Sequence, residues 1–562
     1  MKKIINDPRH VVREMLEGSV FRSPGQALLS NQNVVVRKKH DGNATVAILS
    51  GGGSGHEPAH AGYVGEGLLA AAIAGDVFTS PSVDAVHAAI RVVGGSAGAV
   101  LVVKNYTGDR LNFGLAAEMA RSEGIPVEIV TVADDVALRD TVTPDKRRGI
   151  AGTVLIHKVV GAAAAAGKSV TEVAELGRRA ATGLGSMGVA LGSCTVPAAG
   201  HPGFELGDHE IEYGLGIHGE PGVRKGPIAP ADGLADTVLS TIVDDLGLER
   251  GQRVALLVNG LGATPPMELD ILLRGALHYL HERGIGVERA WCGNFLTALD
   301  MPGASLSLLK VDDALLALLD APASAPAWPG GGKLNDTPIM QIDAAPGEAT
   351  ATSSPSPAGD AVRRAAHAAA QALLAAEDEL TDLDAKAGDG DLGASLRRGA
   401  EAVLTLPDHA WHTPETALRS MADAMRKAIG GSSGPFYATG LMRAARELAG
   451  VAEPTPLQWH AALSSAADAI ADLGGAKAGD RTMLDALYPA ADAYKAALDA
   501  GMKPFEALEA LHLAASRGAE ATATLRANAG RAAYLGDRAM GVQDGGAVAV
   551  AIWMDAVRKS AS

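Results

Sequence analysis

A stretch of small residues and prolines, Ala321–Pro357, divides the sequence into two parts with different folding patterns. It includes APASAPAWPGGGK and AAPGEATATSSPSPAG, and it lacks the periodic apolar residues of a packed helix or strand. Such a composition is typical of a semi-extended linker, which we place at residues 321–357. Beyond it, residues 358–562 are rich in alanine, with apolar residues at helical spacing and almost no β-like runs. The sequence therefore predicts an all-helical domain after the linker.

The part before the linker alternates between strand-like and helix-like segments. Three short β-prone runs each end in a loop rich in glycine or aspartate: Ala44–Leu49, Ala99–Val103 and Val127–Val132. This order is typical of an α/β sheet whose site lies at the carboxyl ends of its strands. Farther along, the pattern changes, and Arg253–Asn259 is predicted to be a strand of a second α/β unit. The two predicted units are residues 1–185 and 186–320.

The charge balance argues against nucleic acid or an anionic membrane as a partner. The 562 residues include 49 basic and 65 acidic side chains, a formal net charge of −16. The two cysteines, Cys194 and Cys292, are too few for a disulfide framework and lack metal-ligand spacing, which favours buried thiols in a reducing compartment. Neither a signal-peptide core nor an apolar run approaching about 18 residues is present, so we predict a soluble, cytoplasmic protein.

Three aspartates lie within eight residues in the helical part: Asp384, Asp389 and Asp391. Carboxylates this dense repel one another unless a cation neutralises them, and hard oxygen ligands select Mg²⁺ or Ca²⁺. An EF-hand does not fit, because its fifth and twelfth positions, counted from Asp389, are Gly393 and Ala400. On spacing alone, a metal site and a solvated acidic turn both stay open.

Three motifs of the α/β part place titratable side chains in loops. Gly51–Pro58 (GGGSGHEP) follows a predicted strand and combines backbone amides with His56. Lys104–Asp109 (KNYTGD) brings a cation and a carboxylate that could act as a general base. Ile217–Gly222 (IHGEPG) holds His218, whose imidazole could act as a nucleophile toward a carbonyl. Each motif has a structural alternative, namely a tight turn, a helix-capping aspartate and a structural histidine.

The helical part contains three further glycine-rich segments. Gly430–Pro435 (GGSSGP) offers hydroxyls and amides suited to phosphate oxygens. Gly479–Leu487 (GDRTMLDAL) and Gly530–Ala547 (GRAAYLGDRAMGVQDGGA) follow it. They add three arginines: Arg481, Arg531 and Arg538. An anion bridged by a metal would explain why these basic groups accompany so acidic a loop.

In this order, the motifs closely resemble those of the single-chain, ATP-dependent dihydroxyacetone kinases. The resemblance rests on GGGSGHEP, GDVFTSPS (Gly75–Ser82), VKNYTGD, IHGEPG, the LD-x3-GDGD-x-G loop, GGSSG, GDRTMLDAL and GRAAYLGDR, and it spans Met1–Ile552. It implies an α/β ketone-binding domain in two parts, joined by a linker to an all-α nucleotide-binding domain that forms an eight-helix barrel. It also implies phosphorylation of dihydroxyacetone, with ATP and Mg²⁺ as cofactors.

The resemblance further implies roles for individual residues. In the family, the histidine matching His218 adds covalently to the substrate ketone, and the residue matching Asp109 deprotonates the hydroxyl with help from that matching His56. The positions matching triose contacts are Gly53, Ser54, Ser80 and Lys104. The acids that hold Mg²⁺ on the ATP phosphates match Asp384, Asp389 and Asp391. The positions matching nucleotide contacts are Leu392, Gly393, Ala394, Ser432, Ser433, Thr482, Met483, Arg531, Asp544, Gly545 and Gly546.

Two positions depart from the family pattern. Gly545 stands where the family usually has proline, and Ala533 stands where it usually has serine. The first change loosens a loop on the nucleotide side, and the second removes a hydroxyl.

Several alternatives stay open at this point. The substrate could be glyceraldehyde or a four-carbon ketose such as L-erythrulose. A lyase that cyclises FAD, with release of AMP, would use the helical domain without His218, and a non-enzymatic ligand sensor would need no nucleotide domain. Because donor and acceptor sites are predicted in different domains, they must meet across an interface. The long linker or a swapped homodimer would allow this, and we expect a homodimer.

Overall fold

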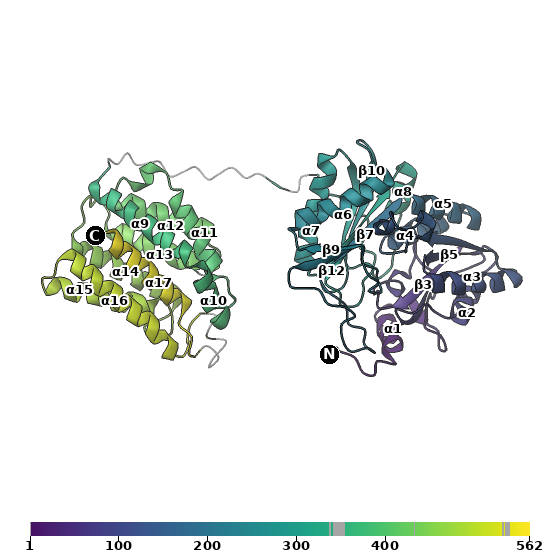
Figure 1. Cartoon of the computed structure of the whole chain (residues 1–562), viewed down its shortest axis with the longest axis horizontal. Coiled ribbons are helices and arrows are strands. Elements are labelled where there is room, and N and C mark those ends of the chain that lie inside the picture. Colours follow the sequence, from purple (N-terminus) through teal and green to yellow (C-terminus); the bar gives the residue numbers. More distant parts are fainter. Residues whose placement is uncertain are drawn as a thin grey trace. The chain divides into compact units, whose positions relative to one another are not determined.

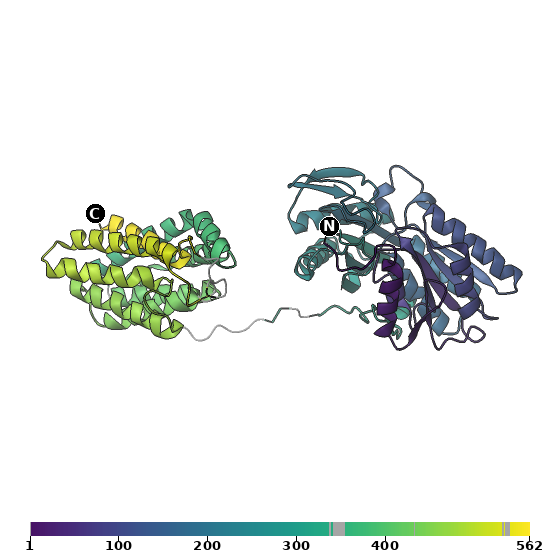
Figure 2. The same ribbon diagram turned by 90° about the horizontal axis from the view of Figure 1, so that it is seen from below.

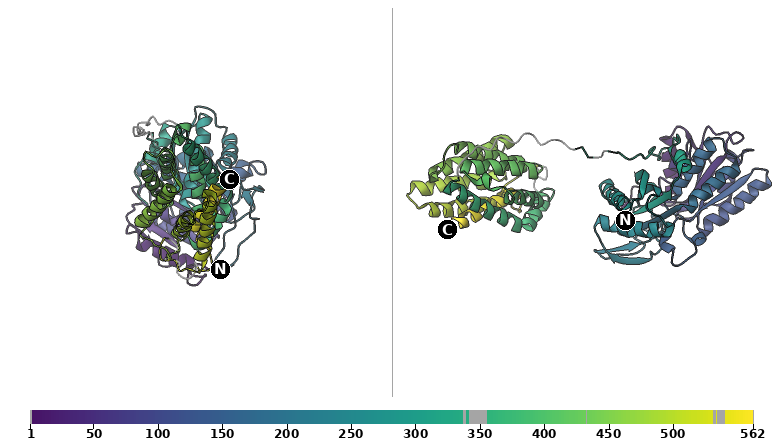
Figure 3. Two further views of the ribbon diagram at one scale, coloured as in Figure 1. Left: turned by 90° about the vertical axis from the view of Figure 1, so that its left-hand side faces the viewer. Right: turned by 90° about the horizontal axis from the view of Figure 1, so that it is seen from above.

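The computed structural model describes residues 2–336, 339–340, 355–431, 433–530, 533 and 540–561 of the chain. Two compact units make up the chain, Met1–Gln341 and Ile342–Ser562 (Figure 1). The first contains two sheets with their helices, and the second is built of helices, as further views show (Figures 2 and 3). The predicted fold class, α/β followed by all-α, is confirmed.

The first sheet has six strands in the order β1-β2-β4-β3-β5-β6. The strands are β1 (Gln26–Leu28), β2 (Val34–Arg37), β3 (Ala47–Ser54), β4 (Ala71–Val77), β5 (Ala99–Lys104) and β6 (Val127–Val132). The last four are parallel, and β1 and β2 pair antiparallel at one edge. Helices cover both faces, which is why β5 reads as a continuous apolar run and is buried throughout. These helices are α2 (Val83–Val93) and α3 (Thr107–Ser122) on one face, and α1 (Val11–Phe21), α4 (Thr153–Ala165) and α5 (Val170–Thr182) on the other.

The second sheet also has six strands, in the order β11-β10-β12-β7-β8-β9. They are β7 (Leu184–Ala190), β8 (Glu210–Tyr213), β9 (Arg224–Pro227), β10 (Arg253–Gly260), β11 (Gly286–Gly293) and β12 (Gly303–Lys310). Only β10 and β11 pair in parallel. Helices α6 (Ala231–Leu246) and α7 (Pro266–Glu282) pack on one face, and α8 (Asp313–Asp320) lies against α4.

The two sheets form one unit because they share an apolar core around α4. Every residue of α4 from Thr153 to Ala164 is buried. The surrounding cluster takes Ile48 and Val100 from the first sheet, and Leu257 and Leu309 from the second. The predicted boundary between residues 185 and 186 falls inside β7, all of which pairs within the second sheet.

Strand β3 extends farther than the sequence indicated. We expected a strand at Ala44–Leu49 followed by a glycine-rich loop, but β3 runs from Ala47 to Ser54 and includes the glycines. Glycine is unfavourable in strands as a rule, yet here close backbone packing requires it. A Cβ on Gly53 would lie 2.6 Å from the backbone nitrogen of Thr79.

The first residues of the predicted linker belong to the α/β unit instead. Trp328 is buried, and its ring lies 5.1 Å from that of Trp291. The indole nitrogen of Trp291 donates to the Gly330 carbonyl, 2.7 Å away, and the Ala290 amide donates to the Gly332 carbonyl at 2.8 Å. Because this segment contains few apolar residues, its composition did not indicate that one tryptophan anchors it to the α/β unit. At the other end, Pro357 already begins a helix.

The helical unit is a closed ring. Its helices are α9 (Pro357–Ala375), α10 (Glu377–Ala387), α11 (Leu392–Leu404), α12 (Pro414–Ala428), α13 (Ser433–Glu447), α14 (Pro456–Gly474), α15 (Leu484–Asp499), α16 (Pro504–Ala521) and α17 (Gly545–Ser560). Helices α11 to α17 each pack against the next, while α9 packs against both α11 and α17 and so closes a ring of eight; α10 is an addition that contacts α11. Threonine or serine caps followed by proline start three of them, at Ser356, Thr413 and Thr455.

Alanine-rich faces leave the centre of the ring open. A cavity of about 650 Å³ lies inside it, lined mainly by alanine, leucine and methionine side chains. Alanine fills little of the space between helices, so the ring closes around a void rather than a packed centre. This confirms the eight-helix barrel expected from the resemblance.

Among the described residues, no helix combines the length and the apolar character needed to cross a membrane.

The two units should fold independently of each other. We expect fragments 1–340 and 355–562, expressed separately, each to unfold cooperatively, because each has its own apolar core. The contacts around Trp328 provide the control, because a first fragment ending at Ala321 loses that ring and should be less stable by about 3 kcal/mol or more. Thermal unfolding followed by circular dichroism measures both. An unfolded 355–562 fragment would show that the unit division is wrong.

Candidate active site

His56 follows β3 directly and is completely buried. Its Nδ1 lies 2.7 Å from the Thr297 carbonyl oxygen, and because a carbonyl can only accept, Nδ1 carries the proton. Burial, then the nearby charge of Lys104, holds the pKa of His56 well below its usual range. The ring is therefore neutral, with the lone pair on Nε2, which has no hydrogen-bond partner among the described residues. This nitrogen is available to accept a hydrogen bond.

Lys104 and Asp109 meet beside Gly52. Lys104 ends β5 and is fully buried, and Asp109 lies in the first turn of α3 with 3% of its surface exposed. A Cβ on Gly52 would lie 2.4 Å from Lys104 Nζ and 3.6 Å from an Asp109 carboxylate oxygen, so glycine is needed for their approach. The other carboxylate oxygen of Asp109, Oδ1, is buried and has no partner in the described part of the chain. An unsatisfied buried carboxylate oxygen is poised to take a hydrogen bond from a ligand hydroxyl.

His218 lies in the loop between β8 and β9 of the second sheet. Its Nδ1 donates to Glu220 Oε1 at 3.1 Å, and its backbone amide donates to Glu220 Oε2 at 2.9 Å. Burial acts to raise the pKa of Glu220, but the hydrogen bonds from the His218 side chain and backbone amide outweigh this and lower that pKa to about 2. With Nδ1 held by the carboxylate, Nε2 of His218 remains as the available nitrogen.

Aromatic rings surround His218 and bring the two sheets together at one site. The ring centroid of His218 lies 4.9 Å from that of His56, 5.3 Å from Phe78 and 4.7 Å from Tyr106. Phe78 also stacks on His56 at 5.3 Å. The predicted residues His56, Lys104, Asp109 and His218 thus converge, although they come from four different segments of the sequence.

The other three predicted triose contacts, Gly53, Ser54 and Ser80, lie against neighbouring backbone. The Ser54 hydroxyl donates to the Gly75 carbonyl at 2.7 Å, which ties β3 to β4. Ser80 lies beside the start of α3, because a Cβ on Gly108 would come within 2.6 Å of its hydroxyl oxygen. Gly53 lies against the backbone of Phe78 and Thr79. All three therefore border the same region.

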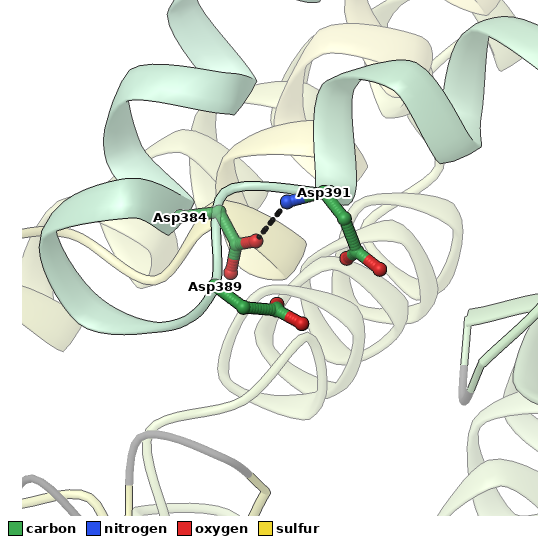
Figure 4. A group of neighbouring side chains, drawn as sticks. All are labelled: Asp384, Asp389 and Asp391. Atoms are coloured by element: carbon green, nitrogen blue, oxygen red, sulfur yellow. Dashed lines mark hydrogen bonds between the residues drawn. The ribbon is translucent and has the colours of Figure 1, made fainter. Parts of the chain in front are cut away.

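In the helical unit, the three aspartates of the acidic loop converge between α10 and α11 (Figure 4). Asp384, Asp389 and Asp391 each offer a carboxylate oxygen, and these atoms lie within 4.8 Å of one another. The Asp391 amide donates to Asp384 Oδ2 at 2.9 Å, which fixes the turn. Carboxylate oxygens in such a group suit a hard divalent cation, so these residues fit the Mg²⁺ implied by the resemblance.

Three predicted nucleotide-binding segments lie next to this loop. A Cβ on Gly545 would be 2.7 Å from Leu392 Cδ2, and one on Gly546 would be 3.6 Å from Met483 Cβ. Asp544 caps α17 by accepting from the Ala547 amide at 2.8 Å, and burial raises its pKa to about 6. The starts of α11, α15 and α17 therefore gather at one end of the ring, where helix N-termini favour anions.

For the remaining predicted nucleotide contacts, the structure gives only their local neighbours. Gly393 packs on α10, since a Cβ there would meet Thr381 Oγ1 at 2.1 Å, and Ala394 follows it in α11. The Thr482 amide donates to Asp485 at 2.8 Å, and Ser433 begins α13. Ser432 and Arg531 lie outside the described residues, as does Arg538.

Two family models match the chain, one for each unit. The model described as the Dak1 domain matches residues 17–327, and the one described as the DAK2 domain matches residues 386–559. The chain belongs to the single-chain dihydroxyacetone kinase family. A "Putative 3,4-dihydroxy-2-butanone kinase" of Solanum lycopersicum is 45% identical over 575 residues, which cover 98% of this chain and 97% of that protein. The "Triokinase/FMN cyclase" of Homo sapiens is 41% identical over 572 residues, 99% of this chain and 98% of that protein.

A solved structure supports the same assignment. The dihydroxyacetone kinase from C. freundii, in complex with AMP-PNP and Mg²⁺, is 34% identical, covers 100% of this chain and 99% of its own, and superposes with a TM-score of 0.63. The predicted family and the predicted enzyme class, a kinase, are confirmed.

Sequence reasoning missed several residues of the α/β site. Glu220 lies two residues after His218 in the same motif, so its carboxylate was a signal that went unused. Phe78 and Tyr106 also lie inside motifs that we had singled out. Thr297, by contrast, contributes a backbone carbonyl, which no side-chain pattern reveals.

The departure at Gly545 gives a prediction about stability. Replacing Gly545 by proline should stabilise the helical unit by about 0.4–1 kcal/mol, because proline suits the first position of α17 and restricts the unfolded chain. The crowding it adds falls on the flexible end of Leu392. Thermal unfolding of the 355–562 fragment measures the change. Gly530→Pro is the matched control, because Gly530 has a φ of +68° that proline cannot adopt, and it should destabilise.

Proposed function

We propose that this protein phosphorylates dihydroxyacetone at the expense of ATP, with the ketone held covalently on His218. The observation that carries the proposal is the position of the His218 ring. Glu220 engages Nδ1, the His218 ring lies against those of His56 and Tyr106, and Asp109 and Lys104 border the same region. A half-buried nucleophile, a base and a cation in one place suit a small polyol ketone better than a nucleotide or a peptide.

In the first step, Nε2 of His218 adds to the carbonyl carbon of the ketone. A nitrogen–carbon bond forms, the carbon–oxygen double bond becomes single, and the oxygen takes up a proton from water. The imidazole gains positive charge as the bond forms, and the Glu220 carboxylate on Nδ1 offsets it. The product is a hemiaminal that fixes the substrate's terminal hydroxyl in place.

In the second step, the terminal hydroxyl attacks the γ-phosphorus of ATP. Asp109 accepts the hydroxyl proton, since its Oδ1 has no partner within the described residues, and the neutral Nε2 of His56 assists. The new phosphorus–oxygen bond replaces the bond to the β-phosphate, and ADP leaves. The hemiaminal then reverses: the nitrogen–carbon bond breaks, the carbonyl re-forms as its hydroxyl loses a proton to water, and the phosphorylated ketone is released from His218. Lys104 donates to a substrate oxygen.

On the donor side, the proposed ATP site is the end of the ring where α11, α15 and α17 begin. Asp384, Asp389 and Asp391 would hold Mg²⁺, which neutralises charge on the phosphates when bound. The predicted contacts Ser432, Ser433, Thr482 and Met483 would bind the nucleotide itself. The solved relative with AMP-PNP and Mg²⁺ supports this proposal.

The deciding experiment is a coupled assay for ADP release with Mg·ATP and a panel of acceptors. The panel contains dihydroxyacetone, glyceraldehyde, L-erythrulose, 3,4-dihydroxy-2-butanone and glycerol. We expect the ketones to be phosphorylated and glycerol to be nearly inert. Absence of ADP release with every ketone and aldehyde would overturn the proposal. The ranking within the panel decides between three- and four-carbon substrates, of which the Solanum lycopersicum relative's name favours the latter.

A second activity that we propose to test is the cyclisation of FAD with release of AMP, because the name of the Homo sapiens relative includes "FMN cyclase". It would use the metal loop and leave His218 idle. In a metal-dependent assay with FAD, Asp391→Ala should abolish the activity and His218→Ala should leave it intact. If Asp391→Ala and His218→Ala lost FAD cyclisation equally, this would argue against an activity that needs the metal loop but not His218. The homodimer and the cytoplasmic location stay predictions, and light scattering in solution tests the first.

A further inference from the structure

Lys104 makes a buried hydrogen bond that the reaction scheme above does not use. Its Nζ lies 2.8 Å from Nε2 of His60 and 3.3 Å from the Gly51 carbonyl oxygen. Lys104 is fully buried, and His60 is 5% exposed. An ammonium has three N–H groups and no acceptor capacity, so it must donate to both. One N–H is then left for a further partner.

The His60 ring is oriented to accept from that ammonium. Its other nitrogen, Nδ1, lies 3.5 Å from the Ser50 hydroxyl oxygen. The Ser50 hydroxyl donates its hydrogen to the Val102 carbonyl at 2.7 Å, so its oxygen can only accept from Nδ1. The proton of the neutral ring therefore lies on Nδ1, and the lone pair of Nε2 points at Lys104.

The third N–H of Lys104 is directed by these two bonds. Because Gly52 lacks a Cβ, Nζ comes to the side of the strand where Asp109 lies. Two of its hydrogens are fixed by His60 and Gly51, which leaves one for the region bordered by Asp109 and His56. We propose that His60 is a positioning residue that fixes the Lys104 ammonium so that one N–H is aimed at the substrate. This inference rests on the proposed function.

The charge state of the pair agrees with this arrangement. Burial, then the charge of Lys104, lowers the pKa of His60 well below its usual range, which keeps the ring a neutral acceptor. Burial also lowers the pKa of Lys104, and the carboxylates of Asp109 and Asp134 oppose that effect. The titratable groups that face Lys104 are His56, His60, Asp109, Asp134 and His157. Removing a neutral acceptor from a buried ammonium lowers the lysine pKa further, because the charged form loses its partner.

His157 on α4 offers a matched control. Its ring packs edge-on against His60, with centroids 5.2 Å apart, and it is equally buried. Neither of its ring nitrogens has a hydrogen-bond partner in the described ranges. Leucine has nearly the volume of histidine, so His157→Leu repeats the packing change of His60→Leu without touching Lys104.

The test compares His60→Leu, His60→Met, His60→Gln and His157→Leu in the full chain with dihydroxyacetone and Mg·ATP. We expect the Leu and Met variants at residue 60 to raise the KM for the ketone about ten- to a hundredfold, with a smaller change in kcat. Their kcat/KM should also fall at a lower pH on the alkaline side than in the wild type, since Lys104 must be protonated to donate. His60→Gln, whose amide oxygen can accept from Lys104, and His157→Leu should both resemble the wild type.

A double-mutant cycle with Lys104→Met separates positioning from a general structural role. If His60 acts through Lys104, adding His60→Leu to Lys104→Met changes ketone binding by less than about twofold. The inference would be overturned if the effects of His60→Leu and Lys104→Met on ketone binding multiplied in the double variant. It would also be overturned if His60→Leu and His60→Met both kept the wild-type KM and pH dependence. A failure of His60→Gln to restore the wild-type profile would also overturn it. If the wild type phosphorylates no ketone, the proposed function is wrong instead. Failure of the His60 inference and failure of the proposed function therefore give different results.

Discussion

Alanine at Asp389 or Asp391 is expected to lower kcat for phosphoryl transfer by about a thousandfold or more. The reason is that each variant removes one carboxylate from a group of three whose oxygens lie within 4.8 Å. Two carboxylates would hold Mg²⁺ weakly, and charge on the transferring phosphoryl group would go uncompensated. Steady-state kinetics over a magnesium titration measure the loss, and binding of the ketone to the α/β unit should be unchanged.

Asp382 supplies the matched control for this experiment. It lies on α10 two residues before Asp384, but its carboxylate is exposed and pairs with Lys386 at 2.5 Å. Exposed pairs of this kind contribute little, so Asp382→Ala should keep nearly full activity. Near wild-type turnover by Asp389→Ala and Asp391→Ala at saturating magnesium would refute the metal assignment.

Part of the geometry of the α/β site could be predicted from the sequence. Strand ends followed by polar loops identified His56, Lys104 and Asp109 correctly as neighbours, because parallel strands end at the same edge of a sheet. The position of His218 relative to them depends on how the second sheet packs around α4. No local pattern encodes that packing, so only the resemblance connected His218 to the rest.

Misplaced boundaries have two distinct physical causes. The glycines of β3 were assigned to a loop because glycine is a poor strand former, although the approach of Lys104 Nζ to Gly52 requires them. The sequence pattern places the beginning of the linker too early, at residue 321, because Trp328 is isolated among small residues. Its partner, Trp291, is distant in sequence, so the burial of both rings follows from tertiary structure alone.

The same limit explains why His60 and Glu220 were not predicted as site residues. His60 lies beyond the end of β3 and meets Lys104, the last residue of β5, so the fold brings together two residues that are 44 positions apart in the sequence. Glu220 was within reach of sequence reasoning, since a carboxylate two residues from a histidine in a tight turn often orients the ring. A histidine motif should therefore be examined together with its nearest acid.

His218→Ala is expected to reduce kcat/KM for dihydroxyacetone by about a hundredfold or more, and to change selection as much as rate. Dihydroxyacetone and glycerol differ only at the central carbon, which is a ketone in one and an alcohol in the other. A hydrogen-bonding pocket separates such similar polyols poorly, whereas addition of Nε2 to a carbonyl is possible only for the ketone. The wild type should therefore prefer dihydroxyacetone strongly, and the alanine variant should narrow that preference. The measurement is kcat/KM for both compounds in both proteins.

Glu220→Gln refines this experiment, because it keeps the size of the side chain and an acceptor for Nδ1. It removes the negative charge that offsets the imidazole when Nε2 bonds to carbon, so kcat/KM for the ketone should fall about tenfold. Glycerol, which forms no such bond, should be phosphorylated at its low wild-type rate. Retention of the full ketone preference by His218→Ala would exclude the covalent step, and His218 would then be a structural histidine held by Glu220. An equal loss for ketone and glycerol in Glu220→Gln would point to the same conclusion, because a residue that only shapes the loop affects both compounds alike.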